Sequence, residues 1–383
     1  MKQSVMFFFL IIVLSIFLLT NTYIYLKTRY AFGDVFPKNL ILNVVFWFIV
    51  LAYPLGRILE RVYNSSFSIF MVKIGSFWMG AMLYLILLFL LVTIFKVLNH
   101  YIEFTPYLDF KINPSYKKWM IISVYAVASL ILLSGYINAR FPRVNNFKLK
   151  FDKTLERTNK TRIVAVSDIH LGTLISAKRL EHLVNLINKQ NPDIVLFAGD
   201  VFDEDIAPVV NNGLGKYFEQ IKSRLGAFAI PGNHEYFGGV EPKLAYLRKH
   251  GVTVLRDSTV LIDNSFYIVG RDDRQSNYTT GKQRKSISEL VANVDKIKPI
   301  ILLDHQPFKL NESAENGIDL QISGHTHHGQ LWPFNYITNA IYELSSGYKR
   351  IGNTHFIVSN GYGTWGPPIR LGNRPEILVI DFD

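Results

Sequence analysis

Four long stretches of the chain are apolar and carry no charged side chain; they are residues 5–26, 40–55, 74–95 and 119–137. A helix needs about 20 residues, at 1.5 Å rise each, to cross the hydrocarbon core of a bilayer. The second stretch is the shortest and contains Asn43 and Pro54, so a buried or re-entrant helix is the alternative there. The pattern predicts an all-α transmembrane region of about four helices within residues 1–139.

The pattern changes after this region. Residues 140–161 are polar and basic, and we interpret them as a connector next to the membrane. From residue 162 onward, short β-rich runs alternate with helical ones, beginning with a strand over 163–167 and an amphipathic helix over 176–189. Further strands are expected at 193–198, 227–230, 252–255, 266–269, 300–303, 320–322, 356–359 and 377–380. The alternation predicts an α/β domain with mixed sheets over residues 162–383.

The formal net charge of +11 is unevenly distributed along the chain. Residues 1–139 carry +7, residues 140–162 carry +6, and residues 163–383 carry −2. The basic excess therefore lies beside the apolar stretches, where anionic lipid headgroups attract it, whereas a nucleic-acid-binding protein carries it on the globular part. We expect membrane lipids as partners and do not expect nucleic acid.

The distribution of basic residues also predicts an orientation. An even number of spans places the N-terminus and everything after residue 140 on one side of the membrane. Short loops and flanks on that side carry ten Lys or Arg residues, against seven on the other side. By the positive-inside rule, we expect a multi-pass protein of the cell membrane whose α/β domain is cytoplasmic. The predicted spans hold no Asp, Glu, Lys, Arg or His, so we interpret them as an anchor and not as a transporter.

Five polar clusters directly follow five of the predicted strands. They are Asp168-Ile169-His170, Gly199-Asp200-Val201-Phe202-Asp203, Gly232-Asn233-His234-Glu235, His305 and Gly324-His325-Thr326-His327. Taken singly, each cluster is explained by a helix cap, a turn or a loop residue. Ligand sites in α/β sheets gather at the carboxyl ends of strands, so the five clusters can converge. Because the chain has no cysteine, any metal must be held by nitrogen and oxygen ligands, and the clusters offer two Asp (Asp168 and Asp200), one Asn (Asn233) and four His (His170, His305, His325 and His327), the ligand set of a binuclear transition-metal site.

The order of these clusters resembles that of the calcineurin-like metallophosphoesterases. That family shows Asp-x-His, Gly-Asp-x-x-Asp, Gly-Asn-His-Asp/Glu, a lone His and Gly-His-x-His, and all five motifs occur here in that order. Residues 361–377 are further similar to the membrane-associated bacterial branch. The resemblance covers about the last 220 residues and implies an α/β fold, a two-sheet β-sandwich flanked by helices, which here follows the transmembrane bundle.

The resemblance also implies how the metal ligands divide. One ion would be held by Asp168, His170, Asp200 and His327, and the other by Asp200, Asn233, His305 and His325. Asp200 is shared, which suits a carboxylate because it can present two oxygens to ions about 3.5–4 Å apart. The ions themselves would be two divalent or trivalent transition metals, manganese, iron or zinc, among which such a ligand set does not choose.

Four further residues are candidates for contacts around the ions. The resemblance implies that His234 is the general acid for the leaving oxygen or a phosphate contact. Asp203 is expected to orient a ligand or loop, with a helix cap as the alternative. His328 is expected at the rim of the site. Arg370 is expected to meet a phosphate or a lipid headgroup, with a surface salt bridge as the alternative.

Two cations this close lower the pKa of a bridging water from 15.7 toward about 7, so hydroxide can attack phosphorus without a side-chain nucleophile. We therefore interpret the chain as a membrane-anchored, metal-dependent phosphoric ester hydrolase that cleaves a phosphodiester or pyrophosphate. An anchor holds the site beside the bilayer, so a lipid-linked anionic substrate is expected. The membrane-associated relatives imply UDP-diacylglucosamine, as in lipid A synthesis.

Two alternatives are open. The first is a nucleotide phosphodiesterase or nuclease of the same superfamily, which the charge of −2 over residues 163–383 disfavours because duplex binding needs a basic face. The second is a non-catalytic membrane scaffold or metal sensor. Degenerate members of the family are expected to lose a ligand, and every motif is intact here.

Overall fold

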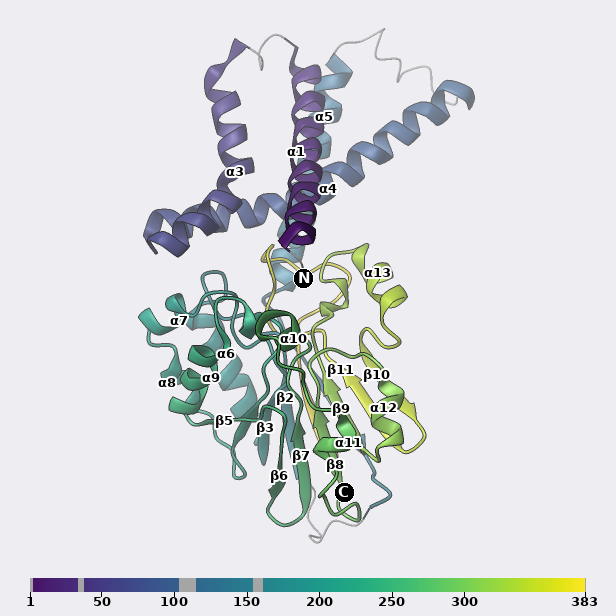
Figure 1. Ribbon diagram of the computed structural model, residues 1–383. Helices are drawn as coiled ribbons and strands as arrows, with labels where there is room; N and C mark the ends of the chain where they lie inside the picture. Colours follow the sequence, from purple (N-terminus) through teal and green to yellow (C-terminus); the bar gives the residue numbers. More distant parts are fainter. Residues whose placement is uncertain (1–2, 34–37, 103–114, 154–160, 383) are drawn as a thin grey trace. The chain divides into compact units, whose positions relative to one another are not determined.

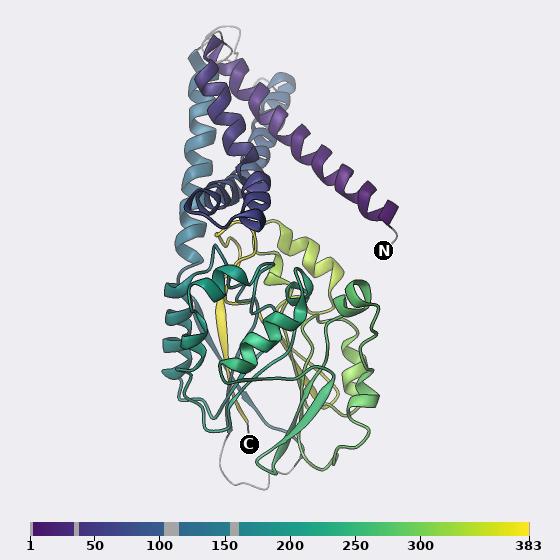
Figure 2. The ribbon, with the colours of Figure 1, turned by 60° about the vertical axis from the view of Figure 1, so that its left-hand side comes forward.

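The structure is a computed structural model that describes residues 3–33, 38–102, 115–153 and 161–382 (Figures 1 and 2). The chain forms two compact units. We call residues 1–137 with 366–369 the helical unit, and residues 138–365 with 370–383 the sheet unit.

The described residues of the helical unit form four long helices. They are α1 (Gln3–Phe32), α3 (Leu40–Val62), α4 (Ser66–Ile102) and α5 (Ser115–Asn138). All four are long and apolar enough to cross a membrane, and each contains one of the predicted apolar stretches, which confirms the predicted helical bundle. The helices run beyond those stretches, so that Lys27, Lys96 and Lys117 lie within α1, α4 and α5.

Small residues and a few internal polar groups organise this unit. At Gly75 of α4, the backbone lies so close to Tyr53 of α3 that a Cβ would collide with it. Such contacts let two apolar helices pack closely where no hydrophobic effect drives them together. The Trp78 indole N–H donates to Asn21 Oδ1 over 2.8 Å, so these polar groups are satisfied inside the bundle.

The sheet unit is built on two six-stranded sheets (Figure 1). The first has the order β1 (Arg143–Leu149), β12 (Glu376–Phe382), β2 (Thr161–Val166), β3 (Ile194–Phe197), β4 (Ala227–Ala229) and β5 (Val252–Val254). The second has the order β10 (Gly347–Ile351), β11 (Thr354–Val358), β9 (Leu320–Ser323), β8 (Ile300–Leu303), β7 (Phe266–Gly270) and β6 (Ser258–Ile262). Each sheet mixes parallel and antiparallel pairs, which confirms the predicted α/β class.

The two sheets share a core and each carries helices on its outer face. Buried side chains of both sheets, among them Leu196 and Ile301, form one apolar cluster. On the other face of the first sheet, a second cluster includes α6 (Ala177–Asn188), α8 (Gly215–Phe218) and α9 (Val240–Lys249). A third cluster joins the outer face of the second sheet to α11 (Ile287–Leu290), and Figure 1 shows α11 and α12 (Leu310–Glu315) on that side.

Short helices occupy the connections between strands. Two of them, α7 (Ala207–Asn211) and the 3₁₀ turn η2 (His234–Tyr236), belong to the loops after β3 and β4. The others, α10 (Gln275–Thr280), the 3₁₀ turn η3 (His327–Gly329) and α13 (Phe334–Ile341), follow β7 and β9.

Three strands lie where the hydrophobic pattern predicted none. β1 lies within the stretch that we interpreted as a polar connector, and it pairs in parallel with β12 from the opposite end of the chain. β6 and β10 are likewise edge strands with partly exposed side chains. An edge strand buries little of its surface, so its sequence carries no clear apolar alternation, and only pairing with a distant strand defines it.

The shared core generates a prediction about stability. Replacing the fully buried Ile301 by alanine should destabilise the sheet unit by about 2–5 kcal/mol, because the methyl groups leave a cavity between the sheets. The unfolding midpoint of the purified full-length protein, followed by tryptophan fluorescence, should fall by roughly 5–15 °C. The matched control is Ile297→Ala, whose side chain is 73% exposed and should change little. Equal shifts for the two variants would contradict the assigned core.

Candidate metal centre

The five polar clusters meet at the carboxyl ends of strands from both sheets. Asp168 and His170 follow β2, Asp200 and Asp203 follow β3, and Asn233 and His234 follow β4. His305 follows β8, and His325 and His327 follow β9. Backbone hydrogen bonds tie neighbouring loops together, since His170 N donates to Asp200 O over 3.0 Å and Gly324 N donates to His305 O over 2.9 Å.

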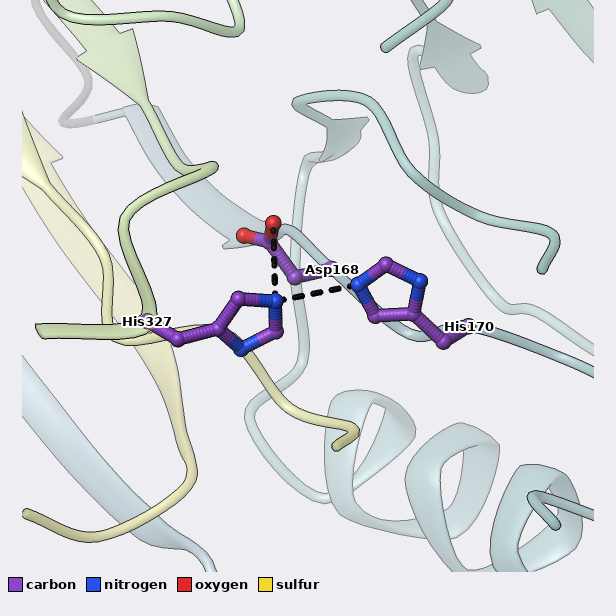
Figure 3. Close-up of side chains that lie close together, drawn as sticks. All are labelled: Asp168, His170 and His327. Atoms are coloured by element: carbon purple, nitrogen blue, oxygen red, sulfur yellow. Dashed lines mark hydrogen bonds and ion pairs between the residues drawn. The ribbon is translucent and has the colours of Figure 1, made fainter. Parts of the chain in front are cut away.

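One group of candidate ligands consists of Asp168, His170 and His327 (Figure 3). His327 Nε2 lies 3.0 Å from His170 Nε2 and 3.6 Å from Asp168 Oδ1. Figure 3 shows the two imidazole rings facing each other, with the carboxylate turned toward His327. These three side chains come from loops of different sheets and are all buried.

A second group consists of Asp200, His305 and His325. Asp200 Oδ2 lies 3.1 Å from His305 Nε2 and also 3.9 Å from His170 Nε2, so this carboxylate faces both groups. His325 Nδ1 lies 2.7 Å from Asn233 Oδ1, which brings the amide into the second group. The structure therefore brings together all seven residues that the sequence singled out as metal ligands.

A third group overlaps the first and joins His170 with Asp203 and His234. His234 Nδ1 lies 3.4 Å from Asp203 Oδ1, and its ring meets that of His170 edge to face at 4.6 Å between centroids. By distance alone, His234 could itself bind an ion.

The backbone is left-handed at five of the candidate ligands. The φ angles are 52° at Asp168, His170 and Asp200, 69° at His325 and 46° at His327. Residues other than glycine adopt this region at a cost of order 1–3 kcal/mol each and do so mainly at functional sites. The five positive-φ residues all belong to the loops from which the candidate ligands converge.

Two glycines of the motifs allow these carboxylates to lie against the backbone. A Cβ on Gly232 would collide with Asp200 Oδ1, and a Cβ on Gly324 would collide with Asp168 Oδ2. The close approach lets Asp200 Oδ1 accept from His234 N over 2.8 Å and Asp168 Oδ1 accept from His325 N over 2.9 Å.

Two buried charged residues that the sequence analysis assigned no role hold the loops in place. The Glu235 carboxylate accepts from the backbone N–H groups of Asp200, Phe202 and Gly232 at 3.0, 2.9 and 2.6 Å. Lys243 Nζ, on α9, donates to three backbone carbonyls, those of Asp203, His234 and Phe237, at 2.9, 2.7 and 2.6 Å.

The sequence offered a different signal for each of these two residues. Glu235 belongs to the Gly-Asn-His-Glu motif. Lys243 shares one face of α9 with the buried Val240, Leu244 and Leu247, so a lysine on an apolar helix face was the available signal.

Arg370 was expected to meet a phosphate or a lipid headgroup, and His328 was expected at the rim of the site. Arg370 is fully buried, so neither a surface salt bridge nor a lipid headgroup occupies it. Its Nη2 donates to Gly363 O over 2.6 Å and to His327 Nδ1 over 3.0 Å. His328 is half-buried, and its Nδ1 lies 2.9 Å from Ser345 Oγ.

Burial keeps three of the four histidines neutral. It lowers the pKa of His170 and of His325 to about 3, with the neighbouring His234 and His305 adding to the effect. Burial, together with the charge of Arg370, lowers the pKa of His327 well below its usual value. Neutral imidazole is the form that binds metal ions, so these rings are ready to act as ligands.

The carboxylates and His305 respond to one another. Burial raises the pKa of Asp168 to about 6, against the opposing influence of His305. Burial alone would raise the pKa of Asp200, but the neighbouring His305 and His234 hold this pKa well below its usual value. Burial alone would lower the pKa of His305, but the neighbouring Asp200 raises this pKa well above its usual value. The centre therefore needs positive charge beside Asp200.

The donor set fits two metal ions. Ligand atoms bound at about 2.0–2.1 Å in a tetrahedral site lie roughly 3.3 Å apart, close to the 3.0, 3.6 and 3.1 Å separations found here. Ala198 O lies 2.7 Å from His305 Nδ1 and can only accept, so in the neutral ring Nε2 is left with its lone pair toward Asp200. His327 Nε2 lies 3.0 Å from His170 Nε2, a separation at which two ring nitrogens could bind one cation through their lone pairs.

Comparisons with known proteins agree on one family. A family model described as calcineurin-like phosphoesterase matches residues 161–329. An uncharacterized metallophosphoesterase of Aquifex aeolicus is 33% identical over 256 residues, which cover 66% of this chain and 97% of that protein.

Other relatives are longer than the matched region. An uncharacterized metallophosphoesterase of Helicobacter pylori is 33% identical over 62% of this chain and 63% of its own length. A transmembrane protein with metallophosphoesterase domain of Danio rerio is 29% identical over 66% of this chain and 60% of its own length. The chain thus spans less than two thirds of these two relatives.

The grouping of ligands predicts how metal is lost. His325→Ala and His327→Ala should each lower the metal content of the purified protein from two ions to about one, measured by inductively coupled plasma mass spectrometry. Because His170 belongs to the group of His327, the pair His327→Ala/His170→Ala should still hold about one ion. The pair His327→Ala/His305→Ala should hold almost none. Equal metal contents in the two double variants would contradict the division into two groups.

Proposed function

The chain belongs to the calcineurin-like phosphoesterase family, and we propose that it is a membrane-anchored enzyme that hydrolyses a phosphodiester or pyrophosphate bond with two metal ions. The observation that carries the proposal is the convergence of two buried ligand groups on the carboxylate of Asp200. Asp168, His170, Asp200 and His327 would hold one ion, and Asp200, Asn233, His305 and His325 the other.

The bound ions would supply Lewis-acid activation of water and neutralise charge on the phosphoryl oxygens. The side chains position this chemistry. Asp200 joins the two groups, and the hydrogen bond from His234 N fixes one of its oxygens at 2.8 Å. Arg370 holds the ring of His327 through Nδ1. Glu235 and Lys243 keep the loops of Asp200 and His234 together, so the reacting groups keep their separation.

We propose that His234 is the general acid that protonates the leaving oxygen. Its Nδ1 faces Asp203 Oδ1 at 3.4 Å, which orients the ring and leaves Nε2 to donate a proton to the leaving oxygen. Phe237 and Trp365 flank the ring, with centroids 5.2 and 5.8 Å from it. Their apolar surfaces would limit the access of water to this proton.

The assigned role of His234 gives the test. His234→Ala should keep about two metal ions and lose about 10²–10⁴-fold in kcat on an alkyl phosphodiester, whose leaving group needs a proton. The loss should be much smaller on bis-p-nitrophenyl phosphate, whose leaving group is stable as an anion. Both substrates are assayed with the metal-loaded full-length protein.

The matched control is His182→Ala, an exposed histidine of α6, which should keep full activity on both esters. Loss of an ion in His234→Ala would make this residue a ligand, as the third group of side chains allows. A wild-type protein that holds two ions and hydrolyses no ester would favour a scaffold or metal sensor.

A specific observation favours a lipid-linked substrate. Around the metal centre, large apolar side chains are exposed: Trp365 is 53% exposed beside His234, and Trp332 is 49% exposed just before α13. On α13, which follows His328, Ile337 and Ile341 are more than half exposed. Acyl chains of a substrate would cover such surface and gain hydrophobic stabilisation. We propose UDP-diacylglucosamine as the substrate to test first.

We also propose that the sheet unit lies in the cytoplasm. The support is the excess of basic residues on the side of the membrane that carries it, ten against seven, which the positive-inside rule assigns to the cytoplasm. A nucleotide-linked lipid would be accessible from that side.

The substrate proposal predicts that the metal-loaded protein releases uridine monophosphate from UDP-diacylglucosamine in mixed micelles. The matched substrate, UDP-glucosamine without acyl chains, should be cleaved at least about tenfold more slowly, since it cannot cover the apolar surface. The substitution Trp365→Ala should reduce the difference between the cleavage rates of the two substrates. If the enzyme hydrolyses bis-p-nitrophenyl phosphate but releases no uridine monophosphate, this substrate is excluded. Preference for a free nucleotide diester would instead favour the nucleotide phosphodiesterase alternative.

A further inference from the structure

A cavity in the helical unit brings three lysines together. It lies between α1, α4 and α5 and has an empty volume of about 360 Å³, its opening included. Its lining residues are Lys27, Tyr30, Ala31, Phe89, Val92, Thr93, Lys96, Lys117, Met120 and Ile121. We call it the lysine cavity.

The position of the lysine cavity along the helices places it at one end of the bundle. Lys27 lies in the last two turns of α1 and Lys117 in the first turn of α5. From Lys117, α5 runs on for about 30 Å, at 1.5 Å per residue, before the chain enters the sheet unit at Asn138. At this end the apolar stretches give way to polar residues, which is the depth at which headgroups lie.

The three lysines contribute positive charge to one place. Each comes from a different helix, and Lys96 interacts electrostatically with both Lys27 and Lys117. Lys117 Nζ lies 4.4 Å from the centroid of the Tyr30 ring, so this ammonium group is held over the cavity wall. Because the three lysines line one cavity, their charges together attract an anion that enters it. Among the described residues that line the cavity, none is acidic.

The remaining lining residues show what kind of anion fits. Ala31, Phe89 and Ile121 are almost fully buried, and Phe89 and Ile121 lie further from this end of the bundle than Lys96 and Lys117 do, so they give the cavity an apolar floor. A free anion gains nothing from such a floor, whereas a phosphate that carries glycerol and acyl chains meets apolar surface directly below its charge. We propose that the lysine cavity binds the phosphate group of an anionic membrane phospholipid.

Lysines near a bilayer surface attract anionic lipids in any case, by about 1 kcal/mol each. That attraction depends on depth and charge alone, so it should be nearly equal for adjacent residues. Lys118 is the neighbour of Lys117 on α5, is exposed, and does not line the cavity. If the cavity is a specific site, replacing Lys117 should weaken lipid binding and replacing Lys118 should not. General attraction predicts equal effects for the two lysines.

The experiment uses native mass spectrometry of the full-length protein, purified in mild detergent and mixed with phosphatidylglycerol or phosphatidylcholine. The wild type and Lys118→Gln should each retain one phosphatidylglycerol with the same apparent affinity, and little phosphatidylcholine. Lys117→Gln and, independently, Lys27→Gln should weaken phosphatidylglycerol binding by about tenfold, as expected for the loss of a charge-assisted hydrogen bond. Size-exclusion chromatography and circular dichroism show whether each variant folds. If one of the two cavity variants, Lys117→Gln or Lys27→Gln, does not fold, the other one alone is sufficient for the test.

Several results would overturn the proposal. Equal affinities for Lys117→Gln and Lys118→Gln would leave only general surface attraction. Equal retention of phosphatidylcholine would remove the requirement for an anion. In a third arm, inorganic phosphate at millimolar concentration should not displace the lipid, and displacement would assign the cavity to a free anion. The result is independent of hydrolytic activity, so the failure of one proposal leaves the other testable.

Discussion

The burial of opposite charges at one point is the constraint on which the sheet unit depends. Asp168 and Asp200 lie out of contact with water, and an isolated buried carboxylate costs several kcal/mol. The structure offsets this cost with backbone N–H groups from distant loops and with the ring of His305, whose Nε2 lies 3.1 Å from Asp200 Oδ2. Because the hydrogen bond from His325 to Asp168 runs from one sheet to the other, the same interaction that stabilises the carboxylate also aligns the two sheets. Metal ions at this point would complete the balance of charge.

This arrangement stores strain that other residues must compensate. Five candidate ligands have left-handed backbone, and two glycines approach carboxylates too closely for any side chain. Glu235 and Lys243 oppose this strain without facing the two principal ligand groups, since each makes three hydrogen bonds to the backbone of the ligand loops. Glu235 and Lys243 are buried, and most of the hydrogen-bonding capacity of each is used. Such residues restrict the conformation of the loops around them. Preorganisation of the centre therefore depends as much on these two residues as on the ligands themselves.

The two units meet different solvents and are stabilised accordingly. In the sheet unit, apolar side chains pack between and outside the sheets because water drives them there. In the helical unit, large apolar side chains such as Leu19 and Leu130 remain exposed, as lipid permits, and polar groups such as Asn21 and Trp78 are paired inside. The exposed apolar surface around the metal centre, including Trp365, belongs to neither pattern, and this is the reason to connect it with a substrate that carries acyl chains.

By itself, the sequence determined the four apolar helices, the α/β class and the candidate ligand residues, because long apolar runs and polar clusters at strand ends are local signals. The tertiary structure alone decided which ligands share a group, since Asp168 and His327 are 159 residues apart in the chain. It also decided that the polar residues of β1 pair with β12, that Arg370 is buried against His327, and that Lys27, Lys96 and Lys117 share one cavity. Each of these features depends on contacts between distant segments. When the neighbours of a side chain come from another part of the chain, the sequence next to it carries little information about them.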